Sequence, residues 1–280
     1  MSATSKIVSV GEIKIGKGCP LVLIAGPCVI ESEKKTIETA VKIKEISGRL
    51  KIPFIFKSSY DKSNRSSVEY YRGPGQKEGL RILSKVKRET GVPVLSDVHC
   101  RTEIAPAAEV LDIIQIPAYL CQQTDMVVEA AKTGKVLNIK KGQFIAPHDM
   151  EKICDKAVSS GNDKIILTER GSVFGYNNLV ADMRSIPIMQ GMGYPVLVDV
   201  THIVRMPGPA SKDPSGGQPE FISVLARASA AAGVDGLFIE VHPEPAEALC
   251  DAASMLKLSG LEELLATVTR IAAIVRRATK

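Results

Sequence analysis

The chain has 280 residues, of which 45% are hydrophobic and 24% are charged. This length allows one large domain or two small ones, and the composition excludes a largely disordered chain. The net charge of +5 is mild and no block of like charges occurs, which argues against a nucleic-acid-binding protein. No apolar run approaches the roughly 20 residues of a membrane helix, so we expect no membrane span.

The cysteines predict a reduced, cytoplasmic protein. They are scattered without CxxC spacing, as Cys19, Cys28, Cys100, Cys121, Cys154 and Cys250. Such spacing favours free thiols over a disulfide framework. The opening stretch, MSATSKIVSVGEIKIGKG, lacks the apolar centre of a signal peptide.

Short and almost continuously apolar runs recur along the chain, which is typical of strands covered on both faces. The eight runs are LVLIAG (21–26), PFIFKSS (53–59), PVLSDV (93–98), DIIQIP (112–117), KVLNIK (135–140), KIILTER (164–170), PVLVDV (195–200) and GLFIEV (236–241). Helical periodicity fills most of the gaps, most clearly at 34–50 and 260–280.

Eight strands alternating with helices in about 250 residues predict a (β/α)8 TIM barrel, an α/β fold, as one domain over 1–280. A doubly wound sheet is the competing architecture, but no GxGxxG follows the first run. Residues 1–18 are predicted to form an N-terminal β-hairpin that covers the bottom of the barrel. Residues 205–219 hold four prolines and three glycines, so we expect an irregular loop that acts as an active-site lid.

Barrel enzymes build their sites at the C-terminal ends of the strands. Here every predicted strand ends in groups that bind anions, bind metals or move protons: Cys28, Lys57, Asp97 with His99, Gln115, Lys140 with Lys141, Glu169 with Arg170, Asp199 with His202, and Glu240 with His242. One polar strand end means little, but all eight together predict a functional site.

One set of these residues is cationic and comprises Lys57, Lys62, Arg65, Lys140 and Arg170. Arg binds phosphate or carboxylate through a planar fork, and Lys supplies a compact charge. Five cations around one barrel mouth repel each other unless anions neutralise them. We therefore predict ligands that carry several anionic groups, such as two phosphates and a carboxylate. The hydroxyls of Ser66 and Ser67 are expected to donate to one of these groups.

A second set comprises Cys28, His202, Glu240 and Asp251, from strands that adjoin in a closed barrel. A thiol, an imidazole and two carboxylates suit a divalent transition metal. The alternative is that Cys28 is a small buried hydrophobe and His202 a hydrogen-bonded core residue. Spacing alone leaves both interpretations open.

The remaining candidates are weaker. We expect His99 and His148 to be structural or surface residues. His242 follows Glu240 by two residues and so shares its strand face, where it is able to support that carboxylate. Cys250 adjoins Asp251, and because adjacent residues seldom both bind one metal, we interpret Cys250 as a packing residue.

Several long segments resemble the 3-deoxy-D-manno-octulosonate 8-phosphate (KDO 8-phosphate) synthase family over nearly the whole chain. They include AGPCVIES, FKSSYDKSNRSS, IQIPAYLCQQTD, TERGSVFGYNNLVADMRSIPIM, DVTH and FIEVHPEP. The resemblance implies a (β/α)8 barrel, usually a homotetramer. It implies condensation of phosphoenolpyruvate with D-arabinose 5-phosphate and water, for lipopolysaccharide assembly in Gram-negative bacteria.

The resemblance also implies roles for the cationic set. Lys57, Lys140 and Arg170 match the phosphoenolpyruvate-binding cations, and we add Gln115 to the substrate-binding residues. Lys62 matches a lysine near the reacting carbons. The remaining matches concern the sugar phosphate. Asn64 matches the residue that contacts the hydroxyl beside the aldehyde, and Arg65 and Ser66 match the residues that bind the phosphate.

Cysteine in the AGPC segment marks the metal-dependent members of this family. The implied ligands are Cys28, His202, Glu240 and Asp251, and zinc, iron, manganese and cobalt all suit them. The expected catalytic residues are Lys62, Asp97, His202, Glu240 and Asp251. Asp97 and the two carboxylate ligands are the available proton acceptors near the attacking water.

The sequence departs from the family pattern in places. Ser63 stands where the family usually has alanine, and the 205–219 segment lacks the usual glycine-rich stretch ending in a basic residue, so we assign it no sugar contacts. Three rival functions stay open. They are a 3-deoxy-arabino-heptulosonate 7-phosphate synthase acting on erythrose 4-phosphate, whose loop usually reads KPRTS; a Schiff-base aldolase using Lys57 or Lys140; and a non-catalytic sugar-phosphate sensor.

Overall fold

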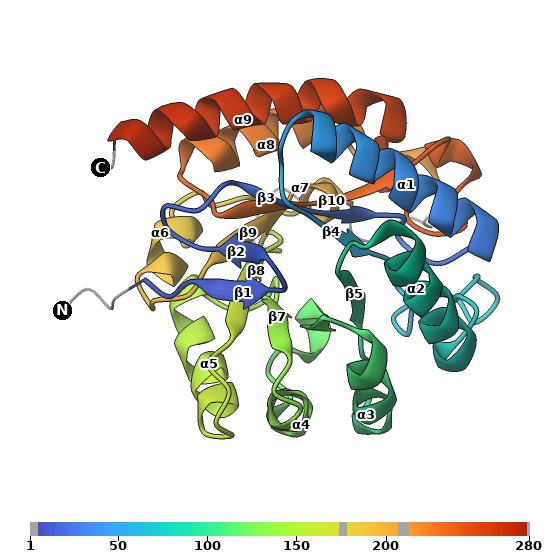
Figure 1. Ribbon diagram of the computed structural model, residues 1–280, viewed down its shortest axis with the longest axis horizontal. Helices are drawn as coiled ribbons and strands as arrows, with labels where there is room; N and C mark the ends of the chain where they lie inside the picture. Colours follow the sequence, from blue (N-terminus) through green and yellow to red (C-terminus); the bar gives the residue numbers. More distant parts are fainter. Residues whose placement is uncertain (1–4, 174–177, 207–212, 279–280) are drawn as a thin grey trace.

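The computed structural model describes residues 5–173, 178–206 and 213–278. Within these residues, eight parallel strands form a closed barrel, as the sequence predicts (Figure 1). The strands are β3 (Val22–Gly26), β4 (Phe54–Lys57), β5 (Val94–Asp97), β6 (Ile113–Ile116), β7 (Val136–Lys140), β8 (Ile165–Glu169), β9 (Val196–Asp199) and β10 (Gly236–His242). Each pairs with the next, and β10 also pairs with β3, which closes the barrel.

Helices surround the barrel on its outer side (Figure 1). Those in the described residues are α1 (Glu33–Arg49), α2 (Gln76–Thr90), α3 (Arg101–Val110), α4 (Thr124–Lys132), α5 (Met150–Val158), α6 (Ser185–Gln190), α7 (Val200–Ile203), α8 (Ile222–Ala231) and α9 (Leu261–Ala278). The two clearest sequence predictions correspond to α1 and α9. Ser32 caps α1 by accepting the Lys35 N–H at 3.3 Å. Among the described residues, no helix is long and apolar enough to cross a membrane.

Short 3-10 turns complete the connections. They are η1 (Ala118–Leu120), η2 (Pro147–Asp149), η3 (Pro214–Gly216), η4 (Pro219–Phe221), η5 (Pro245–Glu247), η6 (Ala252–Ser254) and η7 (Leu258–Gly260). A two-residue strand, β11 (Leu256–Lys257), pairs with the end of β10.

The alternation of side chains along the strands explains why the site lies at one end of the barrel. Inward-facing apolar side chains, including Ile55 and Phe238, fill the lower interior. Lys57 and Glu240 follow these residues by two positions on the same strands, so their side chains point to the same face. The barrel interior thus changes from apolar to charged toward the C-terminal strand ends.

The N-terminal hairpin is present, with β1 (Val8–Val10) and β2 (Ile13–Ile15) paired antiparallel. Val8, Val10 and Ile15 are buried in the same cluster as the lower barrel interior. Figure 1 shows the hairpin lying across the barrel. The predicted covering of the barrel bottom is therefore confirmed.

The predicted lid, 205–219, falls partly outside the described residues, which omit 207–212. On the described flanks, Arg205 and Gly217 form an isolated antiparallel bridge, and η3 follows Asp213. The role of this segment as a lid stays a prediction.

Candidate active site

Two adjoining cavities open at the C-terminal ends of the strands. The strand-end cavity, of about 250 Å³, is lined by Lys57, Asp97, Gln115 and Lys140 among others. The loop cavity, of about 270 Å³, is lined by residues of the segment after β4 and of the segment after β10. Both cavities are lined by Lys62, Asn64, Tyr119, Arg170 and His202.

The structure therefore brings the predicted site residues together. Arg65, Ser66 and Asp251 line the loop cavity. Cys28 and Glu240 are 1% exposed and lie against residues that line the cavities.

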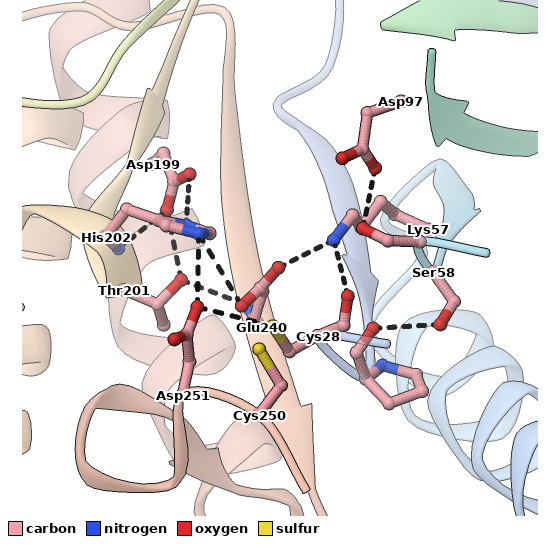
Figure 2. A network of polar contacts seen from close by, with 12 residues as sticks. Cys28, Lys57, Ser58, Asp97, Asp199, Thr201, His202, Glu240, Cys250 and Asp251 are labelled. Atoms are coloured by element: carbon pink, nitrogen blue, oxygen red, sulfur yellow. Dashed lines mark hydrogen bonds and ion pairs between the residues drawn. The ribbon is translucent and has the colours of Figure 1, made fainter. Parts of the chain in front are cut away.

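Close backbone contact between β3 and β4 positions Lys57. A Cβ atom on Gly26 would lie only 1.8 Å from the Lys57 carbonyl oxygen, so glycine is required there. The Lys57 Nζ donates to Glu240 Oε1 at 2.6 Å and to the Cys28 carbonyl oxygen at 3.0 Å, as Figure 2 shows. Lys57 thereby joins the cationic set to the candidate metal ligands.

The cations have carboxylate partners within the protein, which corrects the expectation that only ligand anions neutralise them. Lys57 and Lys62 share Glu240, with the Lys62 Nζ at 3.8 Å from Oε1. Lys140 donates to Asp199. The site cations still outnumber its carboxylates, because Lys57, Lys62, Arg65, Lys140, Arg170 and Arg205 face Asp97, Asp199, Glu240 and Asp251. This excess of cations still favours an anionic ligand, although the cations repel one another less than the sequence predicts.

Electrostatics fix the charge states of Lys62 and Asp97. Burial alone would lower the pKa of Lys62, but the nearby Cys28 and Glu240 raise it well above the usual range. Burial likewise works against ionised Asp97, yet the hydrogen bond from His99 and the charge of Lys62 hold its pKa well below the usual range. Lys62 is thus a protonated donor and Asp97 an ionised acceptor at neutral pH.

His99 lines the strand-end cavity, and its expected structural role stays a prediction. Its Nε2 lies 3.1 Å from Asp97 Oδ2, and its Nδ1 lies 3.4 Å from Glu103 Oε2. Burial opposes protonation of the ring, but these two carboxylates raise its pKa to about 9. His148 is exposed on the surface, as predicted.

The candidate metal ligands meet at a second point in Figure 2. The Nε2 of His202 lies 3.8 Å from Glu240 Oε2 and 3.8 Å from Asp251 Oδ2. The Cys28 thiol donates to the same Asp251 oxygen at 3.3 Å. On the other side of the ring, Nδ1 of His202 lies 2.7 Å from Asp199 Oδ2.

The chemistry of these four residues fits a divalent metal. Metal bonds of about 2.0–2.3 Å in a tetrahedral site place neighbouring donor atoms roughly 3.3–3.8 Å apart. The separations of His202 from Glu240 and Asp251, and of Cys28 from Asp251, fall in this range, and Asp251 links the His202–Glu240 group to Cys28. Burial lowers the pKa of His202 to about 4, so its ring is neutral and its Nε2 is able to bind a metal. A carboxylate behind a metal-binding histidine, as Asp199 is placed here, is a common means of orienting the ring.

Sequence reasoning missed Arg205. Its guanidinium contacts Asp251 Oδ1, while Oδ2 of the same carboxylate faces Cys28 and His202. The residue lay at the start of a loop with no periodicity, so no local signal indicated its target.

Two other predictions change in detail. Ser66 lines the loop cavity, but the Ser67 hydroxyl accepts the N–H of Glu69 at 3.2 Å and so serves a turn. His242 does not support Glu240 directly in the described contacts. Its Nε2 lies 3.5 Å from Glu31 Oε2, and Glu31 Oε1 accepts the Leu249 N–H at 2.8 Å. His242 therefore supports the segment that leads to Asp251.

Cys250 packs with Cys28 and Met255, as its interpretation as a packing residue predicts. Its sulfur atom also faces the site, because Arg65 Nη1 donates to it at 2.7 Å. The packing interpretation is therefore incomplete.

A closed (β/α)8 barrel with a cationic cleft and a buried thiol, imidazole and carboxylate group defines a barrel enzyme for anionic substrates. The model of the DAHP synthetase I family matches residues 3–277. Similar curated proteins include the 2-dehydro-3-deoxyphosphooctonate aldolase of Geotalea uraniireducens, 59% identical over 97% of this chain and 99% of the relative. Those of Trichlorobacter lovleyi and Geobacter sulfurreducens are 57% and 55% identical, over 97% and 96% of this chain and 100% and 98% of the relatives.

The chain therefore belongs to the DAHP synthetase I family and, within it, to the 2-dehydro-3-deoxyphosphooctonate aldolases. That name is a synonym of KDO 8-phosphate synthase, so the resemblance recognised in the sequence is confirmed.

Proposed function

We propose that the protein condenses phosphoenolpyruvate with D-arabinose 5-phosphate and water, giving 3-deoxy-D-manno-octulosonate 8-phosphate and inorganic phosphate for lipopolysaccharide assembly. The observation that carries the proposal is full-length identity above one half to relatives of that name. The division of the cleft into two adjoining cavities, one for each phosphorylated substrate, supports it.

Phosphoenolpyruvate is assigned to the strand-end cavity. Lys57, Lys140 and Arg170 line it and supply the charge that a phosphate and a carboxylate require. Gln115 lines the same cavity, and its side-chain oxygen accepts from Asn138 at 2.9 Å, which orients the amide. Because these groups are buried and held by neighbours, they stabilise negative charge without rearranging during the reaction.

Arabinose 5-phosphate is assigned to the loop cavity. Arg65 and Ser66 line it and are the expected phosphate ligands, and Asn64 is the expected contact of the sugar hydroxyl. Lys62 and Arg170 line both cavities, so the aldehyde and the phosphoenolpyruvate C3 meet beside them. The new bond is therefore proposed to form at the junction of the two cavities.

The reaction forms one carbon–carbon bond and one carbon–oxygen bond to water, and it breaks the carbon–oxygen bond to phosphate. The C3 of phosphoenolpyruvate bonds to the aldehyde carbon, whose oxygen takes a proton from protonated Lys62. Water adds to C2 and loses a proton to a carboxylate, for which ionised Asp97 and Glu240 and the neighbouring Asp251 are the candidates. The C2–O bond to phosphate then breaks, the C2 hydroxyl becomes a carbonyl, and its proton leaves with the phosphate.

Cys28, His202, Glu240 and Asp251 are proposed to hold a divalent metal, namely zinc, iron, manganese or cobalt. Such an ion, when bound, polarises the aldehyde or orients water. The separations of the donor atoms and the neutral His202 ring support this assignment. Asp199 orients the ring, and Arg205 occupies the other oxygen of Asp251.

Three further features are proposed. The 205–219 segment is assigned as a lid because of its length and composition. A homotetramer is proposed from the resemblance, and a cytoplasmic location from the scattered cysteines and the opening stretch of the sequence. Light scattering of the purified protein tests the assembly, and fractionation of the source cells tests the location.

The decisive experiment measures phosphate release from phosphoenolpyruvate with arabinose 5-phosphate or erythrose 4-phosphate. Release with arabinose 5-phosphate that stops on chelation and returns with divalent metal supports both the reaction and the metal. Release only with erythrose 4-phosphate favours the heptulosonate synthase, and no release with either sugar favours a sensor. Borohydride trapping of a substrate on Lys57 or Lys140 would identify the Schiff-base alternative.

The variant Cys28→Ala tests the metal assignment separately. It is expected to lose the response to added metal, whereas Cys154→Ala, which removes an equally buried thiol in α5, keeps it. Full metal content and normal activity in Cys28→Ala would remove Cys28 from the ligand set.

A further inference from the structure

The Cys250 sulfur lies beside two of the candidate metal ligands, Cys28 and Asp251. One ligand atom from each of Cys28, Cys250 and Asp251 lies within 4.8 Å of the other two. The two cysteines are each 1% exposed and Asp251 is 5% exposed, so the cluster is enclosed. Asp251 also belongs to the cluster formed with His202 and Glu240, and it therefore joins the two groups.

Backbone conformation explains how adjacent residues reach one point. In an extended chain, neighbouring side chains point to opposite sides. Asp251 instead adopts the left-handed region, with φ of 51° and ψ of 30°, which turns the chain between the two residues. This conformation is costly for a residue with a side chain and is found most often at functional sites. The Glu31 contact to the Leu249 N–H anchors the segment just before the turn.

The surroundings of the sulfur atom are polar. Arg65 Nη1 donates to it at 2.7 Å, and Cys250 lines the loop cavity. A residue needed only for packing would gain nothing from a cationic neighbour, whereas a sulfur carrying negative charge is stabilised by one.

We propose that Cys250 is a second sulfur ligand of the metal, beside Cys28. The inference rests on the proposed metal site of Cys28, His202, Glu240 and Asp251, and it adds one donor to that set. Two thiolates with an imidazole form a softer ligand set than one thiolate among oxygens. The site should therefore prefer zinc or cobalt over manganese more strongly than a site with Cys28 alone.

Cobalt(II) provides a direct test, because a thiolate bound to cobalt gives a near-ultraviolet charge-transfer absorbance that grows with the number of sulfur ligands. The full-length protein is loaded with cobalt and compared with Cys250→Ser and with the control Cys154→Ser, whose thiol is equally buried. We expect Cys250→Ser to lose about half of the absorbance and its zinc affinity to fall about tenfold or more, with a smaller change for manganese. The control is expected to match the unmodified protein.

The outcomes separate this inference from the metal site itself. Equal absorbance in Cys250→Ser and the unmodified protein overturns the second ligand and leaves the first intact. No charge-transfer absorbance in the unmodified protein overturns the metal site and the inference together. If Cys250→Ser does not fold, X-ray absorption of the zinc-loaded unmodified protein decides, because two sulfur neighbours at about 2.3 Å support the proposal and one contradicts it.

Discussion

The Lys57 ammonium donates to the Glu240 carboxylate at 2.6 Å, and the two side chains are only 1% and 2% exposed. They come from strands β4 and β10, which are both neighbours of β3 in the barrel. The pair joins a residue assigned to phosphoenolpyruvate with a residue assigned to the metal. Loss of either member is therefore expected to affect both substrate binding and stability.

Removing one charge of this pair should cost more than removing both. Lys57→Met leaves the buried Glu240 carboxylate with more distant cations, of which Lys62 at 3.8 Å is one, so the free energy of unfolding should fall by about 3 kcal/mol. The double variant Lys57→Met/Glu240→Leu should be more stable than Lys57→Met alone, although inactive. Urea unfolding of the metal-free proteins measures both. Losses that simply add would show that the two side chains are not coupled.

The Gly26 position should not tolerate a side chain. Gly26→Ala places a Cβ 1.8 Å from the Lys57 carbonyl oxygen, so β3 and β4 must move apart. We expect the free energy of unfolding to fall by about 3 kcal/mol. The control Gly48→Ala lies in α1 with no neighbouring atom within 4 Å and should be neutral or stabilising. Similar thermal stability for the two variants would contradict the close-contact explanation.

Protonated His99 should stabilise the fold in a defined pH window. Its pKa of about 9 in the folded state exceeds the ordinary 6.5, so the stabilisation is complete below pH 6.5 and is lost as the pH rises through 9. The groups that face the ring are Asp97 and Glu103, and Tyr60 donates to Glu103 at 2.9 Å.

The measurement compares the free energy of unfolding of the unmodified protein and His99→Gln between pH 6 and pH 10. The difference should reach on the order of 3 kcal/mol at the acidic end and shrink toward the basic end. The control His148→Gln, at an exposed position, should show almost no difference at any pH. A difference for His99→Gln that does not change with pH would exclude the ion-pair explanation.

Adjacent serines provide a matched test of the sugar-phosphate assignment. Ser66 lines the loop cavity, whereas the Ser67 hydroxyl is engaged by the Glu69 N–H. Ser66→Ala should raise the KM for arabinose 5-phosphate roughly tenfold, because it removes a hydrogen bond to a charged group. Ser67→Ala should leave that KM nearly unchanged. Steady-state kinetics with phosphoenolpyruvate in excess distinguish the two variants. Equal effects of the two substitutions on this KM would show that the phosphate binds elsewhere in the cleft.

Glu31 should control how firmly the metal is held without touching it. Glu31→Gln weakens the contacts to His242 and to the Leu249 N–H, which together hold the segment before Asp251. We expect metal affinity to fall by roughly 10–100-fold. Glu33→Gln, a surface change that affects Arg81 and Lys85, is the control. Competition with a chelating dye measures both, and equal affinities would show that the segment is held by other contacts.

The sequence predicted the barrel and most of the site because both follow from short-range patterns. The apolar runs that ended at Lys57 and Asp97 became strands β4 and β5, and period-2 alternation turned their last side chains into the barrel. The hairpin before β3 was predicted in the same way.

Contacts between distant segments could not be predicted from such patterns. The pairing of Lys140 with Asp199 depends on how β7 and β9 meet in space, and that of Arg205 with Asp251 on how the segments after α7 and β10 meet. The left-handed turn at Asp251 depends on tertiary contacts as well, because the adjoining residues give no glycine signal. Cys250 was for that reason interpreted only as a packing residue.

The hairpin lets the barrel close its floor with residues that lie outside the eight barrel strands. Val10 and Ile15 of the hairpin seal the floor, while the charged side chains stand at the opposite end of the barrel. Protein engineers can therefore adjust heat tolerance by repacking the floor, with the reacting groups left unchanged.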